Sequence, residues 1–402
     1  MRPRRICRMT PRPEAPAPLS RRGPRPLMLH LGLAWMKSSS LSAGSLNWNS
    51  IWANSLPQEA PAPAAPGMTL EEILRADRAL IAGIAAYRSA AYVRQLPAPP
   101  AMWTEEETQL LDYGGNGPAV LFVPSLINRA YILDLMEDGS MLRFLATQNL
   151  RPYLLDWGWP GQVERQFSLT DYIAGRLERA LAAIPGPVIL AGYCMGGLLA
   201  LAAALRAQQA GGKVSALAMF ATPWDFHAAD PSLGHRIGEV MPAVEMMLQF
   251  SGTLPIDALN TLFTMVDPYG VGDKYRDFAA QDKTQPRARR FVAMEDWLAD
   301  GVPLAAPVAR EALGGWYVAN TPARTQWRVA GQAVDPGELT LPAFCAIPAR
   351  DRLVPAISAQ ALAARLPRAT VIQPKAGHIG MVAGTNAEAA LWRPFAEWVR
   401  GL

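Results

Sequence analysis

The 402-residue chain has little of what stabilises secreted domains or anchors proteins in membranes. It contains three cysteines, Cys7, Cys194 and Cys345. An odd, sparse set of thiols does not form a disulfide framework, so we expect a reducing, cytoplasmic compartment. No apolar run approaches the roughly 20 residues that a membrane span requires, so we expect no transmembrane segment. The four histidines and three cysteines show no metal-ligand spacing, so we expect no metal and no other cofactor.

Charge is also sparse, and it is unevenly distributed. Charged residues make up 18% of the chain and hydrophobic residues 50%, which is typical of a globular protein with a sizeable core. The formal net charge is +4, but residues 1–26 hold eight arginines and one acid, hence +7, so the remaining residues carry −3. Because the body is mildly acidic, we expect no nucleic-acid partner.

The N-terminal region differs in composition from the rest of the chain. Residues 1–26 are rich in proline and arginine, which favours disorder. Residues 27–56 mix apolar residues, serines and three tryptophans, and residues 57–67 resemble a proline–alanine linker. We expect residues 1–67 to form a disordered or loosely packed extension, in which 27–56 could contact the body, a partner or an apolar surface.

Residues 68–106 are expected to form an N-terminal helical segment. Thr69, followed three residues later by Glu72, is the pattern of a capping box at the start of a helix. The apolar periodicity then continues to about Arg94. The proline-rich stretch 97–100 stops the helix there.

From residue 107 onward, strand-like apolar runs alternate with helix-like segments. The expected strands are 108–112, 119–123, 152–156, 187–193, 216–221, 343–347 and 370–373. The expected helices are 141–148, 169–184, 197–210, 358–366 and 387–400. This alternation predicts an α/β fold whose mostly parallel sheet is covered by helices on both faces. We assign residues 107–225 and 342–402 to this core.

The alternation breaks over residues 226–341, which are expected to form a cap (lid) insertion over the site. Methionine adapts to irregular apolar shapes, so the methionines of this stretch could line an acyl pocket. They are Met241, Met246, Met247, Met265 and Met294. An ordinary hydrophobic core of the cap is the alternative interpretation of the same residues.

The pentapeptide Gly192-Tyr193-Cys194-Met195-Gly196 carries the strongest chemical signal. It follows an expected strand and precedes an expected helix, which is the context of a nucleophile elbow. The central side chain is a thiol, which a nearby base can activate for acyl exchange. The alternative is a small buried cysteine in an ordinary strand–helix turn.

Two later residues favour the catalytic interpretation. Asp351 and His378 each follow an expected strand, so nucleophile, acid and histidine occur in the chain order of the α/β-hydrolase triad. Asp225, just after the strand 216–221, is the rival acid. The backbone N–H of Met195 and one near Ser125 or Leu126 are the expected oxyanion-hole donors.

Seven blocks of the chain, taken together, resemble the polyhydroxyalkanoate (PHA) synthase family, specifically its shorter catalytic subunits, within the α/β-hydrolase superfamily. The blocks lie at 123–128, 131–134, 153–160, 192–197, 291–301, 351–355 and 377–380. The fourth is similar to the family's lipase box with cysteine as nucleophile. The fifth, with Trp297 and Asp300, resembles its cap segment, and the last two resemble its acid and histidine blocks. The resemblance covers about residues 111–402.

The resemblance implies an acyltransferase that polymerises (R)-3-hydroxyacyl-CoA into PHA and releases CoA, through a triad of Cys194, Asp351 and His378. It implies no cofactor other than CoA as the leaving group. The partners it implies are the hydroxyacyl-CoA, the growing polyester, and either an accessory synthase subunit or a second copy of the chain. It also implies a place at the surface of polyester granules.

Two other functions stay open at this point. The first is hydrolysis, by an intracellular PHA depolymerase, an esterase or an enzyme like dienelactone hydrolase. Dienelactone hydrolases share a similar Gly-Tyr-Cys box, but they lack an insertion as long as the one between Cys194 and Asp351. The second is a non-catalytic granule-surface protein, which the presence of Cys194, Asp351 and His378 disfavours.

Overall fold

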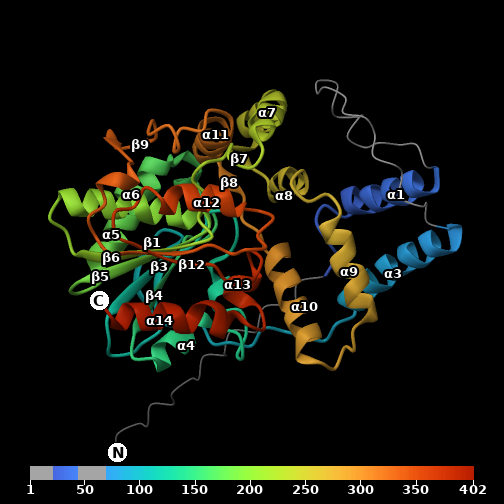
Figure 1. Ribbon diagram of the computed structural model, residues 1–402, viewed down its shortest axis with the longest axis horizontal. Coiled ribbons are helices and arrows are strands. Elements are labelled where there is room, and N and C mark those ends of the chain that lie inside the picture. Colours follow the sequence, from blue (N-terminus) through green and yellow to red (C-terminus); the bar gives the residue numbers. More distant parts are fainter. Residues whose placement is uncertain (1–20, 44–68) are drawn as a thin grey trace, which may run out of the picture.

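In the computed structural model, residues 21–43 and 69–402 are described, and an eight-stranded sheet forms the centre of the molecule (Figure 1). The strand order is β1-β2-β4-β3-β5-β6-β11-β12. β1 and β2, and β2 and β4, pair antiparallel, whereas every pair from β4 to β12 is parallel. The strands are Ala101–Glu105 (β1), Thr108–Asp112 (β2), Ala119–Val123 (β3), Arg151–Asp156 (β4), Val188–Tyr193 (β5), Val214–Phe220 (β6), Ala343–Ala346 (β11) and Ala369–Ile372 (β12).

Helices cover both faces of this sheet, as the alternating pattern predicts (Figure 1). Within β3, Leu121 packs into the core on one face and Phe122 into the core on the other, because successive side chains of a strand point to opposite sides. One face carries η3 (Asp171–Leu177), α5 (Glu178–Ala183), α6 (Met195–Gln209) and α12 (Ala356–Ala363). The other carries η1 (Ala130–Leu133), α4 (Met141–Thr147), α13 (Gly380–Ala383), η6 (Glu388–Trp392) and α14 (Arg393–Arg400).

The predicted fold class is confirmed, and the seven predicted strands and five predicted helices are present with end shifts of at most three residues. The prediction missed β1. β1 is an edge strand whose residues are exposed or only half-buried, so it lacks the apolar run that marks the other strands. Glu106, with φ +49°, turns the chain tightly into β2. The sheet domain therefore begins at β1, and residues 68–106 are not purely helical.

The insertion between β6 and β11 is mainly helical. It contains α7 (Pro231–Ser251), α8 (Ile256–Thr264), α9 (Gly270–Ala280), α10 (Pro286–Ala299), α11 (Ala306–Arg310), η4 (Glu311–Val318) and η5 (Pro336–Glu338). Two short antiparallel pairs accompany these helices: β7 (Thr253–Leu254) with β8 (Leu304–Ala305), and β9 (Arg328–Val329) with β10 (Gln332–Ala333). The remaining short helix, η2 (Glu164–Gln166), follows β4.

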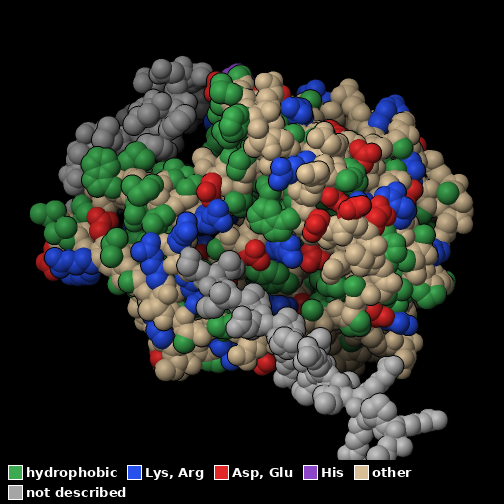
Figure 2. Space-filling model, turned by 180° about the vertical axis from the view of Figure 1, so that it is seen from behind, with side chains coloured by type: hydrophobic (Ala, Val, Ile, Leu, Met, Phe, Trp, Pro, Cys, Tyr) green, Lys and Arg blue, Asp and Glu red, His purple; other side chains and the backbone are tan. Residues whose placement is uncertain are grey.

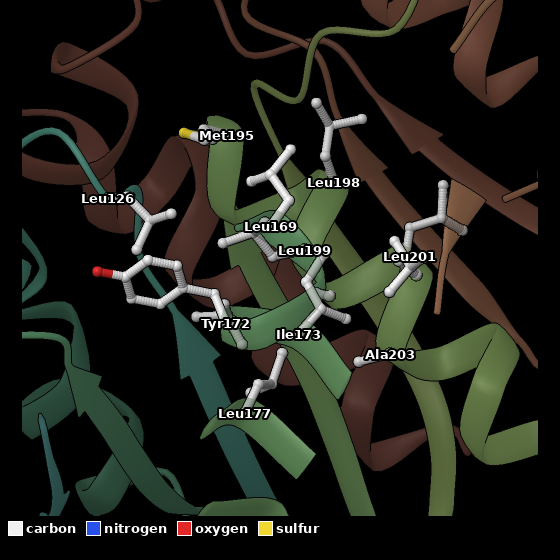
Figure 3. Packing of buried hydrophobic residues seen from close by; sticks show 14 of the residues in the cluster. Leu126, Leu169, Tyr172, Ile173, Leu177, Met195, Leu198, Leu199, Leu201 and Ala203 are labelled. Atoms are coloured by element: carbon white, nitrogen blue, oxygen red, sulfur yellow. The ribbon is translucent and has the colours of Figure 1, made fainter. Parts of the chain in front are cut away.

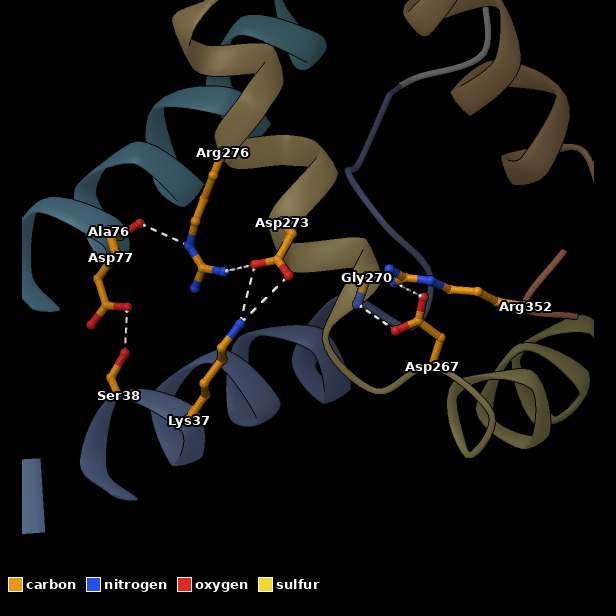
Figure 4. Close-up of polar contacts among 9 residues, drawn as sticks. All are labelled: Lys37, Ser38, Ala76, Asp77, Asp267, Gly270, Asp273, Arg276 and Arg352. Atoms are coloured by element: carbon orange, nitrogen blue, oxygen red, sulfur yellow. Dashed lines mark hydrogen bonds and ion pairs between the residues drawn. The ribbon is translucent and has the colours of Figure 1, made fainter. Parts of the chain in front are cut away.

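The N-terminal helices pack against the insertion, on the side of α8, α9 and α10 that faces away from the sheet (Figure 1). They are α1 (Leu27–Ala43) and α3 (Leu70–Arg88). Ser38 Oγ of α1 donates to Asp77 of α3 (2.8 Å), and Lys37 Nζ donates to Asp273 of α9 (3.3 Å; Figure 4). Between α3 and α9 the backbones touch, because a Cβ on Gly83 would lie 2.0 Å from the carbonyl oxygen of Tyr275.

Residues 21–43 therefore differ from the expected disordered or loosely packed extension. Arg21 forms an ion pair with Asp296 (2.6 Å) and donates to the carbonyl groups of Ala90 (2.6 Å) and Tyr92 (2.5 Å). These long-range contacts order a segment whose own composition favours disorder. The rest of the predicted extension, including Cys7, lies outside the described residues, which omit 1–20 and 44–68.

Helix α3 starts where the sequence predicts and ends earlier than predicted. Glu72 N–H donates to Thr69 Oγ1 (3.3 Å) and Thr69 N–H donates to Glu72 Oε2 (2.8 Å), which confirms the capping box. The helix ends at Arg88 instead of Arg94. Ser89 leaves the helical conformation there (φ −89°, ψ 1°), and its side chain bonds back to the carbonyl group of Ala85 (3.1 Å).

The surface seen from behind is chemically mixed (Figure 2). Acidic and basic side chains are interspersed over the body, whereas hydrophobic side chains gather over the N-terminal helices at the left of the view. Leu70, Leu74 and Ile81 of α3 are among these exposed hydrophobic residues. Over the residues that the structure describes, no helix is long and apolar enough to span a membrane.

Candidate active site

Cys194 lies at the tight turn between β5 and α6 that its motif predicts. Its φ of +56° and ψ of −128° form a backbone conformation that costs a non-glycine residue about 1–3 kcal/mol. Two hydrogen bonds hold this turn: Cys194 N–H donates to the carbonyl group of Phe220 (2.8 Å), and Gly197 N–H donates to that of Cys194 (3.0 Å). Such strain persists only where the surrounding structure enforces it, as it does at a nucleophile elbow.

The glycines after Cys194 are required by close backbone approach. A Cβ on Gly196 would lie 2.0 Å from the carbonyl oxygen of Val123, and one on Gly197 would lie 1.8 Å from Thr222 Oγ1. The start of α6 therefore sits directly against the ends of β3 and β6. This contact places the elbow at the carboxyl edge of the parallel strands, where α/β proteins form their sites.

Buried leucines anchor α6 behind the elbow. Leu198, Leu199 and Leu201 are fully buried, and Figure 3 shows α6 packed against Tyr172 and Ile173 of η3. Each buried leucine side chain contributes about 1.5–3 kcal/mol relative to an exposed one. Such packing offsets the strain at the turn.

His378 and Asp351 lie in the loops after β12 and β11. His378 Nδ1 donates to Asp351 Oδ2 (2.7 Å). The other carboxylate oxygen, Oδ1, accepts the backbone N–H groups of Leu353 (2.8 Å) and Val354 (2.9 Å). Because backbone N–H groups hold Oδ1 in place and Oδ2 accepts from Nδ1, the carboxylate fixes the orientation of the imidazole ring and leaves its Nε2 for another partner.

That partner is Cys194. Burial lowers the pKa of His378, but the charge of Cys194 and hydrogen bonds to Asp351 and Cys194 outweigh it and raise the pKa to about 10. Tyr193 stacks near the ring, with centroids 5.2 Å apart, and its hydroxyl donates to the carbonyl group of His378 (3.3 Å). The structure thus brings Cys194, His378 and Asp351 together, and their catalytic roles stay a prediction.

The rival acid lies elsewhere. Asp225 Oδ1 accepts the backbone N–H of His227 (2.9 Å) and the Asn320 amide (2.8 Å), and so joins the start of the insertion to its end. His227 Nε2 lies 2.8 Å from the carbonyl oxygen of Tyr317, and His235 is an exposed neighbour of Glu239. Asp351, not Asp225, is therefore the acid that contacts His378.

The predicted oxyanion-hole residues have different surroundings. Met195 is the first residue of α6, so its N–H has no acceptor within the helix. Ser125 lies after β3, where its Oγ accepts the N–H of Ile127 (3.2 Å), and it lines the same cavity as Cys194. The side chain of Leu126 is buried in the core near Tyr172 (Figure 3). Their role as oxyanion donors stays a prediction.

A cavity of about 580 Å³ opens beside Cys194 and His378. Its apolar wall includes Phe263, Val266 and Leu298 of the insertion. None of the five methionines that the sequence suggested for this wall is among its lining residues, and Met246 and Met247 are exposed instead. The interpretation of these methionines as an acyl-pocket lining was therefore wrong for this cavity.

Sequence reasoning missed two contributions to the site. Gly23, Pro24, Arg25 and His30 of the N-terminal region line the cavity; residues 1–26 were expected to be disordered, and residues 27–56 were expected only to be able to contact the body, a partner or an apolar surface. Tyr317 of η4 is partly buried against the core, and burial and then the charge of Cys194 raise its pKa. Within the described ranges, no group of three or more His, Cys, Asp or Glu side chains could hold a metal ion.

Comparisons with known proteins agree with this geometry. A family model described as a thioesterase domain matches residues 157–315. The poly(3-hydroxyalkanoate) polymerase subunit PhaC of Synechocystis sp. is 30% identical over 293 residues, which cover 70% of this chain and 77% of that protein. The subunit of Allochromatium vinosum is 28% identical (70% and 80% covered), and that of Thiocystis violacea 26% identical (83% and 93% covered).

The topology and the comparisons support one assignment. The mostly parallel sheet, the strained elbow after β5 and the histidine loop after β12 are those of an α/β-hydrolase fold. The match to the Synechocystis subunit extends over most of both proteins. This chain belongs to the poly(3-hydroxyalkanoate) polymerase family, with the subunits named PhaC.

Proposed function

We propose that this chain transfers the acyl group of a (R)-3-hydroxyacyl-CoA to Cys194 and then onto a growing polyester. The sulfur attacks the thioester carbonyl, a C–S bond to Cys194 forms, and the C–S bond to CoA breaks. Thiol–thioester exchange is nearly balanced in energy, because one thioester replaces another. The hydroxyl of a further unit then attacks the acyl-enzyme, and an ester bond forms as the thiol is released.

His378 and Asp351 manage the proton in this proposal. His378 takes the proton of Cys194, passes one to the departing CoA thiolate, and later accepts one from the attacking hydroxyl. Asp351 holds the ring through the 2.7 Å bond at Nδ1 and stabilises the imidazolium. The raised pKa of His378 supports this assignment, because the surroundings favour the protonated ring beside the sulfur.

The oxyanion of the tetrahedral intermediate is assigned to backbone donors. One is the N–H of Met195, at the positive end of α6. The second comes from the turn after β3, from Ser125 or Leu126. Two such donors lower the barrier by a few kcal/mol, since the loss of one in other enzymes costs about 2.7–4 kcal/mol.

Water must be excluded for ester bonds to accumulate, and the cavity supports this requirement. Phe263, Val266 and Leu298 of the insertion line the cavity beside Cys194, and with an acyl chain seated against them we expect water to be displaced from the acyl-enzyme. The observation that carries the proposal is the His378–Asp351 hydrogen bond, together with the raised pKa of His378 beside Cys194, in a cavity large enough for an acyl chain.

Thioester hydrolysis is the second candidate function. The match of residues 157–315 to a thioesterase domain favours it, because the same triad would deliver water in place of a hydroxyl. Hydrolysis of an ester or of the polyester itself uses the same chemistry. The two candidates differ in their product, not in their first step.

Mass spectrometry and product analysis test the proposal together. After exposure to 3-hydroxybutyryl-CoA, the intact protein is expected to carry a hydroxyacyl adduct on Cys194, with CoA release and insoluble polymer. A free hydroxy acid without polymer would assign the chain to hydrolysis. No adduct and no CoA release with any hydroxyacyl-CoA would remove both candidates.

Under the same proposal, the chain acts in the cytoplasm at the surface of polyester granules, with an accessory subunit or a second copy. Sedimentation with granules made in the presence and absence of each candidate subunit tests this part. Activity of the isolated monomer at full rate would refute the need for either partner.

A further inference from the structure

The histidine of the site is in contact with an aromatic ring from the strand that carries the elbow. Tyr193 is the last residue of β5 and directly precedes Cys194. Its side chain is buried, and it lines the same cavity as His378. The ring centroids of Tyr193 and His378 lie 5.2 Å apart, with 35° between the ring planes. Aromatic pairs in contact have such centroid distances, and at this tilt the phenol lies against a face of the imidazole.

The hydroxyl group of Tyr193 holds the backbone at the same histidine. It donates to the carbonyl group of His378 (3.3 Å). In the turn that follows, Met381 N–H donates to the carbonyl group of Gly377 (3.0 Å), and over the described residues no backbone N–H bonds to that of His378. A partly buried carbonyl group needs a donor. Tyr193 supplies it from a neighbouring strand.

Tyr193 is itself held firmly. Its ring belongs to the same buried cluster as Phe220 of β6 and Met381 of α13, so it has little room to move. Burial, and then the charges of Cys194 and Asp351, raise the pKa of Tyr193 well above its ordinary value. The phenol therefore keeps its proton near pH 7 and acts as a hydrogen-bond donor.

The bond to Asp351 alone does not fix the plane of the imidazole. Asp351 holds the ring at one edge, through Nδ1 (2.7 Å), and a ring held at one edge can still tilt. A tilt turns Nε2 of His378 out of line with the sulfur of Cys194. Contact with the phenol blocks the tilt on that side, because the two rings would overlap.

We propose that Tyr193 is a positioning residue: its ring sets the tilt of the His378 imidazole, and its hydroxyl holds the backbone that carries this imidazole. The proposal rests on the proposed function and deepens it, because it names a residue that acts on the base through contact alone. Tyr193 forms and breaks no bond in the reaction. Since it directly precedes Cys194, the end of one strand carries both the nucleophile and the support of the base.

Two substitutions separate the ring from the hydroxyl. Tyr193→Phe keeps the ring and removes the hydrogen bond, so we expect kcat to fall about 2- to 12-fold, the range of one neutral hydrogen bond. Tyr193→Leu removes both contacts, and we expect kcat to fall about 100-fold, the effect of a displacement of about 1 Å in a reacting group. In both variants, KM for 3-hydroxybutyryl-CoA is expected to change less than about threefold.

The reactivity of Cys194 reports the same geometry without any substrate. An aligned His378 favours the thiolate, which is the reactive form of cysteine. A tilted ring therefore slows the alkylation of Cys194 by iodoacetamide at pH 7, and peptide mapping by mass spectrometry follows this residue alone. We expect the alkylation rate to decrease in the order wild type, Tyr193→Phe, Tyr193→Leu.

Tyr153 provides the matched controls. It is a buried tyrosine of β4 that does not line the cavity. Tyr153→Phe and Tyr153→Leu are expected to lower the thermal transition, but to leave kcat and the alkylation rate of Cys194 within about twofold. If Tyr193→Leu does not fold, Tyr193→Met takes its place, because methionine adapts to an irregular apolar site.

The outcomes distinguish positioning from substrate binding and from the proposed function itself. A folded Tyr193→Leu variant with the kcat and alkylation rate of the wild type overturns the proposal. A raised KM with unchanged kcat and alkylation rate also overturns it, and assigns Tyr193 to substrate binding. A wild type that is never acylated on Cys194 refutes the proposed function instead, whereas the alkylation series, which needs no acyl-CoA, still decides whether Tyr193 positions His378.

Discussion

The two sides of the cavity are built in different ways. The side with Cys194, Asp351 and His378 consists of short loops after β5, β11 and β12, each next to a fully formed parallel strand. The covering side combines helices of the insertion with α1 and the segment before it, which is held by contacts such as Arg21 with Asp296, 275 residues apart. The reactive side is thus local in sequence, and the covering side is not.

This difference affects how strongly each side is held and how well each side can be predicted from the sequence. The loop that carries Cys194 is held by backbone hydrogen bonds and by glycines that let neighbouring segments approach closely. These glycines are part of the sequence motif, so the motif predicts the loop. Apart from the more buried pair of Arg21 with Asp296, the N-terminal part of the covering side is held by partly exposed ion pairs, each of which contributes little. We therefore expect substitutions on the reactive side to abolish chemistry, and those on the covering side to change binding or local order.

Cys194→Ala gives the largest expected effect. The nucleophile is removed and the fold is kept, so CoA release falls by about 10⁴-fold or more, by analogy with triad deletions in other enzymes. A thiol assay of CoA release measures this loss. Cys345→Ala is the control, because Cys345 is buried in β11 and burial raises its pKa to about 12.

Alkylation extends the same comparison. In a Cys7→Ser background, iodoacetamide is expected to modify Cys194 and to spare Cys345 in the folded protein. Full turnover by Cys194→Ala, or equal alkylation of both thiols, would contradict the assignment of Cys194.

Asp351→Asn gives the second-largest expected loss of activity. The amide cannot accept from His378 Nδ1 with the same charge, so the ring loses its orientation and kcat falls by about 10³- to 10⁴-fold. Asp225→Asn is the matched control, since Asp225 contacts Asn320 and not His378; it lowers the melting temperature but keeps kcat within about tenfold. A larger loss of kcat for Asp225→Asn than for Asp351→Asn would reverse the choice of acid.

The third effect is a pH dependence of stability. The pKa of His378 is raised to about 10 from its ordinary 6.5, so the stability that this ring contributes is complete below pH 6.5. It is lost as the pH rises through about 10. The difference in unfolding free energy between wild type and His378→Gln therefore shrinks between pH 6.5 and pH 10.

Urea denaturation at both pH values measures that difference. His235→Gln serves as the control, because His235 is largely exposed, and it shows no such trend. A gap between wild type and His378→Gln that widens toward pH 10 would show that the ring is neutral in the folded state.

Arg21→Ala gives the smallest expected effect on the fold. It removes a mostly buried guanidinium that binds Asp296 and two carbonyl groups, so we expect a loss of about 1.5–3 kcal/mol, the value of a charged hydrogen bond. Limited proteolysis is expected to cut faster between residues 21 and 43. Arg75→Ala is the control, because it breaks an exposed ion pair with Glu71 and is expected to change stability by no more than about 0.5 kcal/mol. Equal effects of the two variants would show that Arg21 does not hold residues 21–43 against the insertion.

Sequence patterns predicted the centre of the molecule because its inner strands, such as β3, β5 and β6, are buried on both faces and so appear as apolar runs. They failed for β1, whose residues are exposed or half-buried, and for the C-terminal end of α3. They also gave no reliable guide to the cavity wall: methionines were one of two interpretations there, and Phe263, Val266 and the N-terminal residues line it instead. Which side chain faces a cavity depends on how helices dock, and composition does not encode it.

The sequence by itself determined the fold class, the elbow at Cys194 and the order in which the acid and histidine follow it, because these depend on strand ends and on glycines next to one another in the chain. Only the tertiary structure decided that Asp351 and not Asp225 holds His378, and that residues 21–43 are ordered and contribute to the lining of the cavity. Those outcomes rest on hydrogen bonds and ion pairs between distant segments. These contacts stabilise the protein only after folding has brought the distant partners together, so a local sequence pattern does not reveal them.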